Sequence, residues 1–267
     1  MNLSIVLSTQ PASFSALAYQ GKLEENIAKI AELGYAGVEL AVRDPSLLDL
    51  KALEAVVHTN NLVVPAIGTG QAYGEEGLSV TSTDQSIRDR AIERLHSQAV
   101  LAAGFKAVVI LGLIRGRAGS QEAEGPAHDL LVEAIKVVAG KANQVKFALE
   151  PINRYETDLI NTVAEGLSLV DKVGLDNFGL LLDTFHMNIE EKDIAASIKD
   201  AGDRMFHLHI ADSNRWYPGG GHTDFAAIVE ALDRIDYKAF ISAEIMPLPD
   251  SDTAAAKTIE FMRSITA

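Results

Sequence analysis

The chain has 267 residues, of which 48% are apolar and 22% charged, enough to bury the core of one large domain or two small ones. Its net charge of −14 disfavours nucleic-acid binding, and the lack of cysteine excludes disulfides and thiolate metal sites. The N-terminal stretch MNLSIVLSTQ lacks the features of a signal peptide, and no apolar run reaches the roughly 20 residues of a membrane helix, so we expect a cytoplasmic protein with no membrane partner.

Eight short, largely aliphatic runs recur along the chain, and each is followed by a loop, as is typical of buried parallel strands. Segments with helical spacing lie between them. The first, LEENIAKIAELGY, ends at Gly34, the second runs from a capping Asp84 to Gly104, and the third lies between a capping box at Thr162 and Gly174. Two further segments, 190–202 and 223–235, repeat the scheme. The strand-like runs are 3–8, 37–42, 63–69, 106–113, 146–151, 178–183, 205–210 and 239–245.

Eight strand–helix units in 267 residues, about 33 residues each, match the scale of a (β/α)8 barrel, which has about 250 residues. A doubly wound open sheet is the alternative fold, but it usually has fewer strands and a glycine fingerprint after the first one. Here the first strand leads into STQPASFS, which contains no glycine. We therefore predict an α/β protein with one TIM-barrel domain over residues 1–267.

A polar residue ends each of the last four strands: Glu150 in ALEP, Asp183 in LLLD, His209 in HLHI and Glu244 in SAEI. Catalytic groups of TIM barrels lie at these C-terminal strand ends, and strand alternation directs all four side chains at the barrel axis. Three converging carboxylates would repel one another unless they were protonated or shared a cation. With one imidazole they suit a divalent ion such as Mn²⁺, Mg²⁺ or Co²⁺, whereas Zn²⁺ fits less well without thiolates or more histidines.

Two glycine-rich stretches carry weaker signals. AIGTGQAYG at 66–74 resembles a dinucleotide-binding loop only in part, and we interpret it as a loop over the barrel mouth in which no helix begins. PGGGH at 218–222 follows the seventh strand, where some barrels bind a phosphate; a mobile lid is the commoner role of such a stretch.

Three long motifs resemble the D-tagatose/D-psicose 3-epimerase family of the xylose-isomerase-like barrels: ALEPINRYETDLINT, LLLDTFHMNIEE and HLHIADSNR. The N-terminal motifs VLSTQPASFSALAYQGKL, VELAVRDPS, AIGTGQAY and GLIRGR are more similar to the 5-keto-L-gluconate epimerases, a group within that family that acts in inositol catabolism and forms D-tagaturonate. This second resemblance covers nearly the whole chain.

The resemblance implies a role for each matching residue. The metal ligands of the family fall on the four strand-end residues, with Mn²⁺ as the expected ion. Its catalytic acid–base pair falls on Glu150 and Glu244. Its substrate-contacting residues fall on Glu156, on His186 in the loop after the sixth strand, and on Arg215. A small keto-sugar or ketouronate substrate and a homo-oligomer, a dimer or tetramer, are implied as well.

The predicted reaction is a metal-dependent epimerisation, in which the carbon beside a ketone is inverted through an enediolate. The favoured substrate is 5-keto-L-gluconate, and the alternatives are a ketohexose 3-epimerase or a related sugar or hydroxypyruvate isomerase. A uronate would need a cation, which Arg43, Arg115 or Arg117 could supply. An apurinic endonuclease would need more histidines at the mouth and a basic surface. A non-catalytic sugar-binding protein would not need two such glutamates.

Overall fold

The computed structural model describes residues 1–119 and 125–266. Its strands are β1 (Asn2–Ser8), β2 (Tyr19–Gln20), β3 (Gly37–Ala41), β4 (Ala66–Gly68), β5 (Val108–Leu111), β6 (Phe147–Leu149), β7 (Phe178–Asp183), β8 (Met205–Ile210) and β9 (Phe240–Ala243). Its α-helices are α1 (Leu23–Glu32), α2 (Leu50–Thr59), α3 (Gln71–Glu76), α4 (Gln85–Phe105), α5 (Pro126–Lys141), α6 (Val163–Val173), α7 (Thr184–Glu190), α8 (Ile194–Ala201), α9 (Phe225–Arg234) and α10 (Ser251–Ile265).

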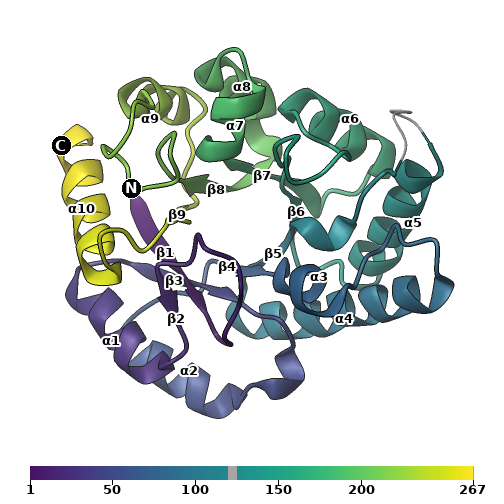
Figure 1. The fold of residues 1–267 in the computed structure, drawn as a ribbon, viewed down its shortest axis with the longest axis horizontal. Coiled ribbons are helices and arrows are strands. Elements are labelled where there is room, and N and C mark those ends of the chain that lie inside the picture. The colour runs from purple at the N-terminus through teal and green to yellow at the C-terminus, as the bar shows by residue number, and fades with distance from the viewer. Residues whose placement is uncertain (120–124, 267) are drawn as a thin grey trace.

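The strands form a closed parallel barrel. Each strand from β3 to β9 pairs with the next in chain order, and β9 pairs back with β1 to close the ring. The short strand β2 extends the pairing only at the C-terminal end of β1, where Leu7 and Ser8 face Tyr19 and Gln20. Helices surround the barrel (Figure 1). The predicted (β/α)8 TIM-barrel fold is confirmed, and the two-residue β2 is an addition that no sequence pattern indicated.

Local sequence signals set most helix boundaries. The Asp84 carboxylate accepts a hydrogen bond from the backbone of Ser86 at the start of α4. The capping box between Thr162 and Glu165 is present at α6. The predicted end of α4 at Gly104 is wrong, because the helix continues to Phe105 and ends where Lys106 adopts left-handed backbone angles. Glycine inside a helix is tolerated at a cost of about 1 kcal/mol, so it does not always end one.

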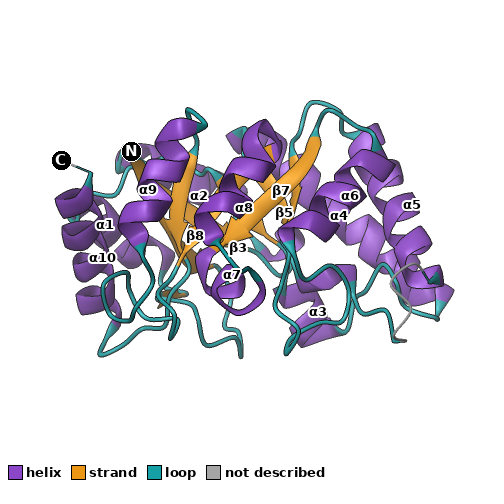
Figure 2. Cartoon of the chain, turned by 90° about the horizontal axis from the view of Figure 1, so that it is seen from above, coloured by secondary structure: helices purple, strands orange, loops and turns teal. Residues whose placement is uncertain are grey.

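The stretch at 66–74 is also corrected. Helix α3 begins there at Gln71, just after β4, and it lies with α7 at one end of the barrel (Figure 2). Six residues are too few for helical periodicity to stand out in a sequence. Across the described part of the chain, no helix is both long and apolar enough to cross a membrane.

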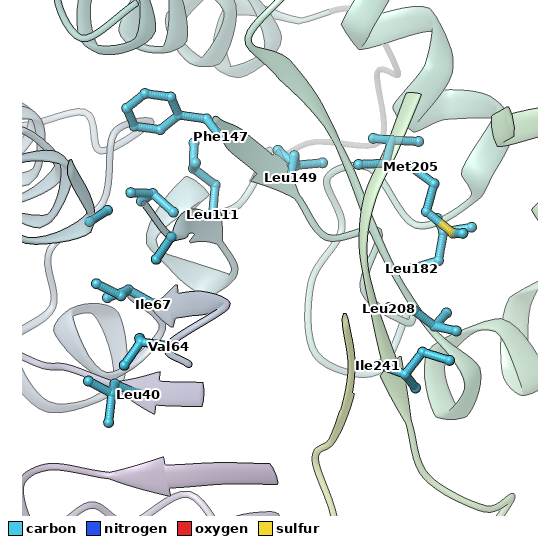
Figure 3. Close-up of a cluster of buried hydrophobic side chains, with 14 of the residues drawn as sticks. Leu40, Val64, Ile67, Leu111, Phe147, Leu149, Leu182, Met205, Leu208 and Ile241 are labelled. Carbon is cyan, nitrogen blue, oxygen red and sulfur yellow. The ribbon is translucent and has the colours of Figure 1, made fainter. Parts of the chain in front are cut away.

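The two faces of the barrel strands carry different side chains. Outward-facing aliphatic residues pack under the helices, and Figure 3 shows several of them around the ring. Inside the barrel, Ala66, Ile110, Ala148 and Leu181 form a separate small apolar cluster. Ala148 precedes Glu150 by two residues, and Leu181 likewise precedes Asp183. Because side chains alternate along a strand, the apolar cluster is the layer that supports the polar residues at the strand ends.

Candidate metal centre and active site

The four strand-end residues lie together at the barrel mouth. Glu150 follows β6, Asp183 ends β7, His209 is in β8 and Glu244 follows β9, so neighbouring strands bring them to one place. One ligand atom of each lies within 4.8 Å of those of the others. His209 Nδ1 is 3.8 Å from Glu150 Oε1, 3.9 Å from Asp183 Oδ2 and 3.9 Å from Glu244 Oε1.

The atoms that face this point fit a metal ion. Glu150 Oε1, Asp183 Oδ2 and His209 Nδ1 are buried, and within the described residues none has a hydrogen-bond partner. Buried polar atoms of native proteins are nearly always bonded, so three unpartnered atoms facing one another indicate a missing partner. Carboxylate oxygens with one imidazole nitrogen are the donors of a divalent ion such as Mn²⁺ or Mg²⁺.

The electrostatics of the site also favour a cation. Burial and the neighbouring Glu244 carboxylate together raise the pKa of Glu150 to about 8. Burial likewise raises the pKa of Glu244. For His209, burial favours the neutral ring, but Glu39 and Glu244 outweigh it and raise its pKa to about 10. Carboxylates that lie close together and are shielded from water are stabilised by positive charge, which here comes from the imidazole or from a bound ion.

Asp183 serves two structural purposes. Its Oδ1 accepts a hydrogen bond from the Phe185 N–H at 2.7 Å and so caps α7, while its Oδ2 faces the other ligands. Helix α7 therefore starts directly after β7. His186 was expected in a loop, but it lies in the first turn of α7, with Nε2 3.6 Å from Glu150 Oε1. Burial lowers the pKa of His186 to about 3, which keeps the ring neutral.

Arg215 connects the predicted substrate-binding residue Glu156 with Glu244 of the candidate metal centre. Its guanidinium bonds to Glu244 Oε2 and to Glu156 Oε1, the latter at 3.4 Å. It also lies over the rings of Phe14 and Phe185, with 5.0 Å and 4.6 Å from its central carbon to the ring centroids. Stacking between aromatic rings restrains a planar guanidinium in one orientation. Phe14 belongs to the STQPASFS stretch that begins at the end of β1.

A cavity of about 270 Å³ adjoins these residues. It is lined by Glu150, His186, His209, Arg215 and Glu244 and by residues of the N-terminal half, including Phe14, Leu17, Thr69, Gln71, Glu75 and Leu113.

The three arginines expected to serve a uronate have other contacts. Arg115 is fully buried, and its guanidinium donates to backbone oxygens of Gly112, Glu150, Leu159 and Ile160. Arg117 donates to the Glu156 carbonyl, and Arg43 lies 3.7 Å from Glu76. Arg115 thus fixes the backbone beside Glu150 instead of reaching into the cavity.

Sequence reasoning missed two polar residues that contact the site. Asn153 Nδ2 lies 2.7 Å from His186 Nδ1 and 2.9 Å from Glu156 Oε1. Glu39 Oε1 lies 2.9 Å from His209 Nε2. Glu39 carried a usable signal, since a carboxylate inside the apolar run GVELAV must face either solvent or a partner. Asn153 carried none beyond its place in the NRYE motif.

Comparison with known proteins agrees with the fold and the site. A family model described as a xylose isomerase-like TIM barrel matches residues 27–265. The L-ribulose 3-epimerase of Mesorhizobium japonicum is 32% identical over 95% of this chain and 86% of its own length. The D-psicose 3-epimerase of Ruminiclostridium cellulolyticum is 33% identical over 82% of this chain and 76% of its own length. A crystal structure of D-allulose 3-epimerase from Methylomonas sp. with D-allulose has a TM-score of 0.85 and 30% identity, and covers 99% of this chain and 96% of that one.

The fold and the site together define a TIM-barrel enzyme of the carbohydrate isomerases, with a candidate metal centre at the strand ends. The chain belongs to the xylose isomerase-like TIM-barrel family, and the relatives that it matches along most of their length are ketose 3-epimerases.

Proposed function

We propose that the chain is a metal-dependent 3-epimerase of a neutral ketose. The observation that carries this proposal is the pair Glu150 and Glu244, which share one candidate metal centre and line one cavity. In the barrel, β6 and β9 are separated by β7 and β8, so the two carboxylates approach the cavity from different directions. Inversion at a carbon needs one group to remove a proton from one face and another to return a proton to the opposite face.

The chain's own residues suit each step. One glutamate accepts the proton from C3, and the electron pair of the broken C–H bond moves toward the C2 ketone to give an enediolate. The other glutamate, protonated, delivers its proton to the opposite face of C3. His186 Nε2–H and the Arg215 guanidinium donate hydrogen bonds to the substrate oxygens. A divalent ion held by the four strand-end residues would supply the Lewis-acid polarisation of the ketone.

The residues of the N-terminal half that line the cavity support a substrate tail that donates hydrogen bonds. The Ser8 hydroxyl donates to the Gln10 carbonyl, so its oxygen accepts the bond from Gln71 Nε2 at 2.7 Å. This fixes the orientation of the Gln71 amide and leaves its Oε1 as a buried acceptor without a partner. Glu75 adds a second acceptor to the same lining. Both suit a sugar hydroxyl and disfavour a carboxylate.

The prediction of 5-keto-L-gluconate as substrate, with D-tagaturonate as product, is the second candidate. It rests on the N-terminal motifs, and the expected role in inositol catabolism depends on it. Among the described residues that line the cavity, Arg215 is the only arginine or lysine, and it is already paired with Glu156 and Glu244. A carboxylate on the substrate tail would therefore lack a free arginine or lysine as a partner. The relatives named for L-ribulose and D-psicose favour the neutral ketose.

A turnover screen tests the proposal. The metal-free protein is loaded with Mn²⁺, Mg²⁺ or Co²⁺ and incubated in D₂O with L-ribulose, D-psicose, D-fructose, D-tagatose, 5-keto-L-gluconate and D-tagaturonate. We expect NMR to show inversion and deuterium at C3 of a neutral ketose, with Mn²⁺ the most effective ion. Turnover confined to the two acids would establish the second candidate. Deuterium at C1 with an aldose product would indicate an isomerase and contradict the epimerase.

The acid–base pair is tested by Glu150→Gln and Glu244→Gln. Each change keeps the shape of the side chain but removes a proton acceptor, so we expect turnover to be abolished while circular dichroism stays native. Glu165→Gln is the matched control, because Glu165 belongs to the capping box of α6 and glutamine also serves there. Full activity in either site variant would refute the assignment.

A further inference from the structure

A second polar cluster lies inside the barrel beside the metal centre. Glu39 stands in the middle of β3, faces the interior and is 1% exposed. Its Oε2 is 2.8 Å from His207 Nε2, and its Oε1 is 2.9 Å from His209 Nε2. His207 Nε2 also lies 2.9 Å from Ser242 Oγ, which in turn contacts Ser4 Oγ at 2.5 Å. A carboxylate is costly to bury, so these contacts must stabilise it.

The chemistry of the contacts fixes the histidine tautomers. An ionised carboxylate only accepts hydrogen bonds, so both rings that meet Glu39 must carry a hydrogen on Nε2. For His209, this orients the ring with Nδ1 toward Glu150, Asp183 and Glu244. Nδ1 is also the buried His209 atom without a hydrogen-bond partner. One nitrogen is therefore held by Glu39, and the other is available to a metal ion.

We infer that Glu39 is a positioning residue for the metal ligand His209. It fixes the tautomer and the ring orientation, and its negative charge makes Nδ1 a better electron donor. Partners of this kind, one bond beyond the ligand, typically change metal affinity by about 10–100-fold. His207, which is 1% exposed, holds the Glu39 carboxylate in place from the other side. The inference depends on the metal centre and not on which sugar is the substrate.

The same cluster could in principle hold an ion of its own, since Glu39, His207 and His209 offer three atoms close together. The distances of 2.8 Å and 2.9 Å from Glu39 to the two rings are those of hydrogen bonds, which leaves Glu39 no role as a ligand. One ion per chain is therefore expected in the loaded wild type, as measured by elemental analysis. Two ions per chain would overturn the inference.

Glu39→Gln tests the positioning role directly. His209 Nε2 lies 2.9 Å from Glu39 Oε1 and 3.1 Å from Glu39 Oε2, so the NH₂ group of the new amide opposes the N–H of this ring whichever way the amide is turned. The His209 ring must therefore change its tautomer or turn. We expect Mn²⁺ affinity, measured by calorimetry on the metal-free protein, to fall about 10–100-fold. The electron paramagnetic resonance spectrum of bound Mn²⁺ should change as well. If Glu39→Gln does not fold, Glu39→Met removes both acceptor atoms at similar volume and carries the same expectation.

Two comparisons separate positioning from general stability. Ser242→Ala removes the contact between Ser242 and His207 but leaves the bond between Glu39 and His209. Mn²⁺ affinity should therefore stay within about threefold of wild type, far less than the loss of about 10–100-fold expected for Glu39→Gln. In a His209→Asn background, where the ligand is already lost, adding Glu39→Gln should cause no further loss of affinity. An equal loss in both backgrounds would overturn the inference, as would wild-type affinity in a Glu39→Gln protein whose melting temperature has dropped.

Discussion

At the residue scale, the neighbours of Asn153 determine how His186 can act. Asn153 Oδ1 accepts a hydrogen bond from the Tyr155 N–H at 3.0 Å, so its Nδ2 is the atom that faces His186 Nδ1 and Glu156 Oε1. An amide nitrogen only donates, which makes His186 Nδ1 an acceptor and places the hydrogen of the neutral ring on Nε2. That nitrogen is the one near Glu150. Asn153 therefore sets His186 as a neutral hydrogen-bond donor in the cavity.

Asn153→Asp should reverse this tautomer. The new carboxylate would accept a hydrogen from Nδ1 and leave Nε2 without one, so the substrate would lose a donor that stabilises negative charge on its oxygen. We expect kcat to fall about 10²–10³-fold, with a smaller change in KM, in steady-state assays. Asn161→Ala is the control, since the Asn161 side chain donates to the backbone carbonyls of Ile152 and Thr157. It should lower the melting temperature and spare kcat. A kcat near wild type in Asn153→Asp would contradict the assigned tautomer.

The four candidate metal ligands were easier to predict from the sequence than the residues around them. Strand alternation and strand ends together indicated Glu150, Asp183, His209 and Glu244, because residues at the same height on neighbouring barrel strands lie close together. Asn153 lies in a loop, where no periodicity relates position to direction. Its contact with His186 depends on how this loop folds back against α7 at the mouth, and a single sequence does not encode that in a repeating pattern.

At the element scale, the glycine-rich loop after β8 folds around the carboxylate of Asp212. Asp212 Oδ1 accepts from the N–H groups of Ser213 at 2.7 Å and Thr223 at 3.0 Å, and Oδ2 accepts from Gly219 at 2.9 Å. A Cβ on Gly221 would overlap with Asp212 Oδ1, so only glycine fits there without a shift of that carboxylate. These N–H groups are bonded to Asp212, which leaves them unavailable to a phosphate. The lid role of 218–222 stays a prediction.

Asp212→Asn should loosen this loop in a pH-dependent way. Burial raises the pKa of Asp212, but the hydrogen bonds from Thr223 and Ser213 outweigh it, and the net pKa is lowered. A lowered pKa adds stability above the unfolded-state value of about 4, and this stability is lost as the pH falls through the folded pKa. We expect Asp212→Asn to cost about 1–3 kcal/mol at pH 7 by urea unfolding, and less at pH 3.

A suitable control for this change is Asp224→Asn in the same connection. Asp224 caps α9 through the Ala227 N–H, and asparagine caps about as well as aspartate. The control should therefore cost little at either pH. An equal cost of Asp212→Asn at pH 7 and pH 3 would show that the carboxylate charge does not stabilise the loop.

Elements also differ in how far the sequence predicts them. The eight barrel strands and the helices α1, α4, α6, α8 and α9 have clear periodicity or caps, so they were predicted and only their ends moved, whereas α2, α5 and α10 were not among the predicted segments. Helices α3 and α7 are six and seven residues long, too short to show a period. Helix α7 exists because Asp183 caps it, and that carboxylate had been interpreted only as a metal ligand. Because Asp183 both caps α7 and faces the other candidate ligands, its place at the end of a strand indicated only one of its two roles.

At the scale of the whole molecule, the metal centre connects elements that are far apart in the chain. Its four candidate ligands come from the ends of β6, β7, β8 and β9, and β9 closes the ring by pairing with β1. Glu39 brings β3 into the same network through His209. A bound ion would therefore hold together strands from both halves of the barrel. The expected dimer or tetramer stays a prediction, since a single chain carries no record of it.

Metal binding should consequently stabilise the entire fold. An ion that binds only the folded chain adds about 2.7 kcal/mol when its concentration is 100 times its Kd. In a chain of this size that corresponds to a rise in melting temperature of roughly 5–10 °C. We expect calorimetry to show this rise when Mn²⁺ is added to metal-free protein and to show its loss with a chelator. The Glu150→Gln/Glu244→Gln double variant should lose most of the shift while its metal-free melting temperature stays the same or increases, because two mutually repelling carboxylates are gone. An equal rise in the double variant would place the stabilising ion outside the four strand-end residues.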